Sequence, residues 1–140
     1  MVANSFRFFG VPARLPASVV DLHLLNISPD DEHEFVAVNL GPACGSTINS
    51  GADVQALLTL AYAQAAAGSH SPIRFIAAAC PGASSEGRAF ADPNLGQDHK
   101  TFTFTAGKTL YFSGIPEPDG SQHFDLGMIG FLDIFSLPNF

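Results

Sequence analysis

The stretch TFTFTAGKTLYF, residues 101–112, decides the fold class of this chain. Its first five residues alternate threonine and phenylalanine, so Phe102 and Phe104 fall on one face of an extended strand. The alternation is interrupted at Gly107, which accepts the backbone conformation that a tight turn needs. A second alternating segment, LYF, completes the stretch. The pattern predicts a β-hairpin with an aromatic inner face.

Two further segments before this stretch indicate strands, and one indicates a helix. Residues 18–27 alternate apolar and polar side chains, and after a Ser-Pro-Asp-Asp turn the apolar residues 35–40 return as a second strand, which predicts another hairpin. Residues 52–67 carry apolar side chains at helical spacing. Ser50 and Asp53 precede and begin this segment in the pattern of a capping box. We therefore expect a single inserted helix at about 52–67.

The remaining segments favour a β-rich fold. Residues 73–79, between two prolines, are expected to form a strand, and residues 123–137 a final strand or hairpin. Residues 80–100 are polar and predict a long loop, which in a compact domain is usually functional or interfacial. The pattern as a whole predicts a mainly β fold, a β-sandwich or jelly-roll-like domain with one inserted helix. The alternative is an open α+β sheet with the helix on one face.

The first 17 residues differ from the rest of the chain. Residues 1–17 contain two prolines and little periodicity, yet they are too apolar for a disordered tail. We expect an extended N-terminal arm at 1–17 that docks on its own body or on a neighbour, followed by a single β-rich domain at 18–140. The candidate interface residues of this arm are Phe6, Phe8, Phe9 and Arg14.

Composition and charge limit the classes of partner. The net charge is −7 and the six Lys and Arg residues are scattered, which disfavours nucleic acids and anionic membrane surfaces. No apolar run is long enough to span a bilayer, and no signal peptide is visible. Only 14% of the residues are charged, so either much of the surface is covered by copies or partners, or a monomer carries a Ser/Thr/Asn-rich surface.

Cysteines, histidines and acids suggest no cofactor. Cys44 and Cys80 are wrongly spaced for zinc, and without a secretion signal we expect reduced thiols, although a bridge is possible. The five histidines have no paired metal spacing, so a zinc or iron centre would have to assemble from distant strands. The densest ligand cluster is Asp30, Asp31, Glu32, His33 and Glu34. It lacks the glycine of a calcium loop, so we expect a solvated turn and neither a metal nor a catalytic residue.

Residues 102–112 resemble a T-V-P-A-G-K-T-x-Y segment of β-sandwich proteins from tailed-phage virions and related bacterial surface proteins. The resemblance implies a virion-type sandwich, as in capsid decoration proteins that trimerise on a shell. The leading hypothesis is therefore a non-enzymatic, self-associating decoration (cement) protein on the virion surface, assembled in the cytoplasm, with its own copies and a major capsid protein as partners. The alternatives are a cytoplasmic small-ligand or carbohydrate-binding module, or a small enzyme.

Overall fold

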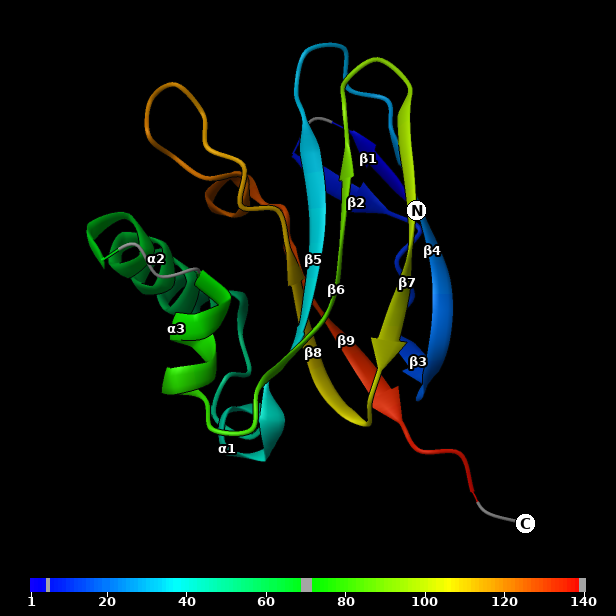
Figure 1. Ribbon diagram of the computed structural model, residues 1–140, viewed down its shortest axis with the longest axis vertical. Helices are drawn as coiled ribbons and strands as arrows, with labels where there is room; N and C mark the ends of the chain where they lie inside the picture. Colours follow the sequence, from blue (N-terminus) through cyan, green and yellow to red (C-terminus); the bar gives the residue numbers. More distant parts are fainter. Residues whose placement is uncertain (5, 69–71, 139–140) are drawn as a thin grey trace.

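The computed structural model describes residues 1–4, 6–68 and 72–138, with the side chains of 64–68 and 72 left out. Two β-sheets face each other, and three helices cover the far side of one of them (Figure 1). The four-stranded sheet has the order β2 (Arg7–Phe9), β1 (Val2–Asn4), β4 (Ser18–Asn26), β7 (Gly96–Phe104). The five-stranded sheet has the order β3 (Arg14–Pro16), β9 (Ile129–Phe135), β8 (Gly107–Phe112), β5 (His33–Asn39), β6 (Ser84–Ala91). The helices are α1 (Gly41–Gly45), α2 (Gly51–Gly68), α3 (Pro72–Ala79) and the short 3-10 helix η1 (His123–Leu126). The predicted mainly β sandwich is thus confirmed.

Strand β5 is buried along its whole length and separates two hydrophobic cores. It pairs with β6 on one side and with β8 on the other, so all seven of its residues are covered. Phe35 and Ala37 face the four-stranded sheet. Val36 and Val38 face the helices. A strand covered on both faces needs nearly continuous apolar side chains, and the segment FVAV supplies them.

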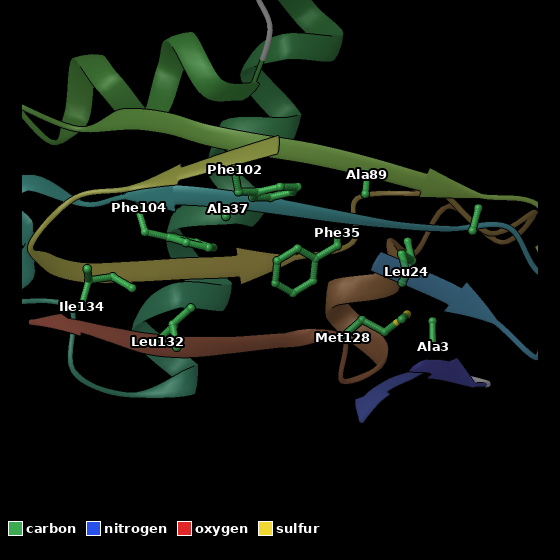
Figure 2. Packing of buried hydrophobic residues seen from close by; sticks show 11 residues of the cluster. Ala3, Leu24, Phe35, Ala37, Ala89, Phe102, Phe104, Met128, Leu132 and Ile134 are labelled. Carbon is green, nitrogen blue, oxygen red and sulfur yellow. The ribbon is translucent and has the colours of Figure 1, made fainter. Parts of the chain in front are cut away.

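The core between the sheets is aromatic. Phe102 and Phe104 from β7 are fully or almost fully buried, and their rings stack with centroids 5.8 Å apart. Phe35 from the opposite sheet lies 5.9 Å from Phe102, and Leu132 and Ile134 of β9 complete the same layer (Figure 2). The predicted inner face of residues 101–104 is therefore confirmed.

The predicted hairpins are wrong, because each pair of strands is divided between the sheets. β7 pairs with β4, whereas β8 pairs with β5 and β9. β4 and β5 are separated in the same way. An alternating pattern shows which face of a strand is apolar, but two strands of one sheet and two strands of facing sheets both send that face into a core.

Buried polar side chains stabilise the crossing from β7 to β8. The Asn39 amide donates to the backbone oxygen and the hydroxyl of Thr105, at 3.0 and 2.9 Å. Glu86 accepts from the Thr105 backbone N–H at 2.8 Å and from the hydroxyl of Thr109. Burial raises the pKa of Glu86. The crossing backbone cannot join a sheet ladder, so these side chains supply the hydrogen bonds that it needs.

Helix α2 begins as expected, but the expectation of a single helix is wrong, because α1 and α3 were missed. Ser50 Oγ accepts from the Asp53 N–H at 3.1 Å while Asp53 accepts from the Ser50 N–H at 3.2 Å, which is the predicted capping box. Residues 73–79 form helix α3 and not a strand, because Ile73, Ile76 and Cys80 recur at helical spacing and alanine favours the helix. Among the described helices, none has the length and apolarity needed to cross a membrane.

The segment 80–100 is not one long loop. It supplies all of β6 and the first half of β7. In β6, the buried residues are Glu86, Ala89 and Ala91, whereas Ser84, Ser85 and Arg88 are exposed. The sequence of this strand therefore looks polar. A bulge at Ala37/Val38 also disturbs the alternation opposite Gly87.

Residues 1–17 supply three strands. β1 pairs with β4, and β3 pairs with β9, both in parallel. The division into an arm and a domain at 18–140 stays a prediction.

The two cysteines form a disulfide, which corrects the expectation of reduced thiols. Cys44 of α1 and Cys80 after α3 lie 5.4 Å apart between Cα atoms. The bridge closes a loop of sequence separation 36 that holds α2 and α3. In a chain-entropy model, closing a loop of this size stabilises the fold by about 4 kcal/mol.

The aromatic core predicts a large difference between the two faces of β7. Phe102→Ala should lower the free energy of unfolding by about 3–5 kcal/mol, because it removes a fully buried ring. The matched control is Thr103→Ala, one residue away on the exposed face, which should cost no more than about 1 kcal/mol. Urea unfolding followed by circular dichroism measures both. Equal losses would show that the two faces are not packed as described.

Candidate metal centre

Two buried histidines meet at one end of the five-stranded sheet. His33 is the first residue of β5, and its side chain is fully buried. His123 is the first residue of η1, in the connection between β8 and β9. The connection folds back across the sheet end through a bridge between Pro116 and Gln122 and a hydrogen bond from the His123 N–H to the Ile115 oxygen, 2.9 Å long. Residues 90 positions apart therefore become neighbours.

The Nδ1 atoms of the two imidazoles face each other. His33 Nδ1 and His123 Nδ1 are 3.2 Å apart, and the ring centroids are 5.0 Å apart. A third polar atom, the Oγ of buried Ser113, lies 3.4 Å from His123 Nδ1. His123 Nδ1 thus has two potential ligand atoms close to it, one from His33 and one from Ser113.

The other nitrogen of each ring is fixed from outside. His123 Nε2 lies 2.7 Å from the Glu117 carboxylate, and His33 Nε2 lies 2.8 Å from Ser28 Oγ. An ionised carboxylate only accepts, so His123 carries its proton on Nε2 and, as a neutral ring, directs a lone pair from Nδ1 toward His33. Asp31 also reaches this outer side, with a carboxylate oxygen within 4.8 Å of the ligand atoms of Glu117 and His123.

Burial keeps His33 neutral at physiological pH. Removal from water and, to a smaller extent, the nearby His123 together lower the pKa of His33 to about 4, while Asp31 opposes the shift. Metal ions bind the neutral imidazole, so a histidine held in this form needs no deprotonation to become a ligand.

Ser113 and Met128 are tied to the histidines through the backbone. The Ser113 N–H donates to the Met128 oxygen at 3.1 Å, and the Met128 N–H donates to the His123 oxygen at 3.2 Å. Met128 is fully buried, and its thioether side chain belongs to the core between the sheets (Figure 2). The Glu34 N–H donates to Ser113 Oγ at 3.3 Å, which leaves the Ser113 proton free to point at His123.

Glu34 and Tyr62 hold the segment next to Ser113. The Glu34 carboxylate accepts from the Gly114 N–H at 2.8 Å and from Arg88 Nε at 2.7 Å. The Tyr62 hydroxyl lies against Gly114, so closely that a Cβ there would overlap it. Burial raises the pKa of Tyr62, and the carboxylate of Glu34 raises it further. Gly114 is required here because no side chain fits between the backbone and the ring.

The acidic cluster of residues 30–34 is divided by the fold. His33 and Asp31 contribute to the centre, and Glu34 supports it from behind. Asp30 and Glu32 are exposed.

The candidate interface residues have different environments, and their interface role stays a prediction. Phe6 packs edge-on against His123 at 5.2 Å, and Phe8 against Phe35 at 5.2 Å. Phe9 is half exposed, and the exposed Arg14 lies over the ring of Phe135 at 4.8 Å.

The pairing of His33 with His123 could not be predicted from histidine spacing, which left open only the assembly of a centre from distant strands. The topology of the sheet brings these two residues together although they lie 90 positions apart. The connection between β8 and β9 carries Ser113, His123 and Met128 in that order. This succession of side chains of the ligand type is a signal that could have been noticed. Of the remaining histidines, His70 lies outside the described residues.

No protein-family model matches this chain, and no curated protein matches it. Among solved structures, auracyanin A, described as a "blue" copper protein from Chloroflexus aurantiacus, is similar, with 18% identity and a TM-score of 0.54, covering 96% of this chain and 98% of its own. Reduced auracyanin from the photosynthetic bacterium Roseiflexus castenholzii is similar with 18% identity and a TM-score of 0.52, covering 94% and 85%. Auracyanin B gives 22% identity and a TM-score of 0.52, covering 94% and 82%. The chain has the cupredoxin fold.

These similarities overturn the virion hypothesis. The matches extend over nearly the whole chain, whereas the resemblance to virion proteins covered only residues 102–112. That segment is a strand, a glycine turn and another strand, and the cupredoxin fold contains it with the strands in different sheets. The capsid decoration function, the trimer of copies, the capsid partner and the virion location were wrong, as was the alternative of a carbohydrate-binding module.

Close packing at Gly114 predicts a coupled pair of substitutions. Gly114→Ala should lower the free energy of unfolding by about 1–3 kcal/mol, because its methyl group collides with the Tyr62 hydroxyl. Tyr62→Phe removes that hydroxyl and should cancel part of the cost in the double variant. Thermal unfolding of the two single variants and the double variant gives the coupling energy. Strictly additive losses would contradict the contact.

Proposed function

We propose that this protein binds a single copper ion through the Nδ1 atoms of His33 and His123. The observation that carries the proposal is their separation of 3.2 Å, with each Nε2 already hydrogen-bonded to an outer partner. Ligating histidines in metalloproteins almost always use one nitrogen for the metal and the other for such a partner. The similarity in fold to auracyanin A, described as a copper protein, favours copper over the other ions that imidazole accepts.

The distances fit an ion bound between the rings. Two nitrogen ligands about 2.0–2.1 Å from one ion, at a tetrahedral angle, lie about 3.3 Å apart. The observed separations are 3.2 Å for the two Nδ1 atoms and 3.4 Å between His123 Nδ1 and Ser113 Oγ.

The same residues do not fit a blue copper centre. That centre needs a cysteine thiolate beside two histidines. Cys44 and Cys80 are joined in a disulfide, and Figure 1 places α1, which holds Cys44, at the end of the sheet opposite the start of β5. The side chain that reaches the histidines is the hydroxyl of Ser113.

The donor set therefore favours holding copper over rapid electron transfer. Met128, tied by backbone hydrogen bonds to Ser113 and His123, is the residue that would supply a soft thioether ligand. Thioethers select Cu(I). We propose a copper carrier or store that is not an enzyme. Because disulfides persist in oxidising compartments, we expect it to act outside the cytosol.

Substitution of either histidine should lower the affinity for Cu(I) more than substitution of Glu117, which contacts His123 and is farther from the ion. His33→Ala and His123→Ala should lower it by about 100-fold or more, and Glu117→Gln by about 10–100-fold, because Glu117 only orients His123. Competition with a chromogenic Cu(I) chelator measures each affinity. Asp30→Asn and Glu32→Gln, exposed members of the same acidic turn, are the matched controls and should bind as the wild type does. Equal affinity in all variants would contradict the proposal.

Introducing a cysteine thiolate at position 113 should change the colour of the copper-bound protein. Ser113→Cys places a sulfur beside both imidazoles, so the Cu(II) form should show an intense visible thiolate band that the wild type lacks. Ser113→Ala is the control and should remain without the band. A folded Ser113→Cys protein that binds Cu(II) without colour would show that Ser113 does not face the ion.

A further inference from the structure

A second group of ligand-type side chains lies on the outer face of the four-stranded sheet. β4 and β7 run antiparallel, and their register places His23 directly opposite His99. Asp21, two residues before His23, projects from the same outer face. The inward-pointing neighbours Leu22 and Leu24 anchor this part of β4 against the core. Two regular strands therefore hold the three side chains in a defined arrangement.

The carboxylate already connects the two imidazoles. Asp21 Oδ1 lies 3.2 Å from His99 Nδ1, and Asp21 Oδ2 lies 3.5 Å from His23 Nε2. The rings are stacked, with centroids 4.9 Å apart and planes inclined by 15°. One ligand atom from each of the three residues lies within 4.8 Å of the ligand atoms of the other two.

We propose that Asp21, His23 and His99 form a second metal site, for an exposed divalent transition-metal ion of the Zn²⁺ or Cu²⁺ class. Two imidazoles and a carboxylate are ligands that such ions accept, and water completes the coordination of an ion bound at a surface. The side chains are 61% to 68% exposed, so the rings can turn from stacking to ligation without disturbing the core. The net charge of −7 attracts cations to the protein as a whole.

This exposed site is independent of the buried copper centre. It lies on the four-stranded sheet, while the buried histidines belong to β5 and η1. It offers an exposed carboxylate beside its two imidazoles, so it favours divalent ions over Cu(I). Failure of either proposal leaves the other in place.

Titration calorimetry with Zn²⁺ on the whole protein tests the proposal. The wild type should bind one more equivalent than His99→Ala and His23→Ala, or bind that equivalent at least about tenfold more tightly, as expected when a direct ligand is removed. Thr101→Ala, an exposed neighbour that lies opposite Asp21, is the matched control and should keep the wild-type stoichiometry.

A second measurement locates the ion directly. Backbone amide NMR signals of residues 21–23 and 99–101 should shift as the extra equivalent of Zn²⁺ is added, and the shifts should disappear in His99→Ala. An unchanged Zn²⁺ stoichiometry and affinity in both histidine variants, or NMR shifts confined to other residues, would overturn the proposal. Asp21, His23 and His99 would then be ordinary solvated side chains.

Discussion

The structure depends on a single strand that must be covered on both faces. β5 lies between β6 and β8, with the aromatic core of the sandwich on one side and the helices on the other. Burial of such a strand leaves no choice of register, because a shift by one residue would exchange the two cores. It also fixes the position of His33, the first residue of the strand, at the end of the sheet. The candidate metal centre is therefore built on a strand that is buried along its whole length.

A buried pair of imidazoles needs an explanation beyond packing. Both side chains lose their contact with water, and polar groups in that position are stable only when their hydrogen bonds are satisfied. Glu117 and Ser28 satisfy the outer nitrogens, so the inner nitrogens are oriented toward each other without any further adjustment. Preorganisation of this kind lowers the cost of binding an ion. Cys44 and Cys80 are joined in a disulfide, so the polar side-chain atom beside His123 Nδ1 is the hydroxyl of Ser113.

Local patterns predicted local features well. The alternation at Phe102 and Phe104 showed the inward face of β7, and Ser50 with Asp53 marked the start of α2. The same patterns could not show which strand pairs with which, because a hairpin and a crossing between sheets present the same alternation. Helix α3 was mistaken for a strand because eight residues are too few to separate the two periods securely.

The site was less accessible from the sequence than the fold. The acidic turn was noticed for its carboxylates, yet its histidine is the residue that matters, and the partner of that histidine lies 90 positions away. The disulfide joins residues 36 positions apart for the same reason. Contacts of this kind are set by the topology of the two sheets, which no local spacing records.

Long-range ¹⁵N NMR of the histidine rings during Cu(I) titration shows whether His33 and His123 bind one ion through Nδ1. Cu(I) is diamagnetic, so every ring nitrogen remains visible. We expect the Nδ1 signals of both residues to shift together and saturate at one equivalent, while their Nε2 signals keep the character of hydrogen-bonded nitrogens. Nδ1 signals that stay unchanged while Cu(I) binds elsewhere would contradict the proposed centre.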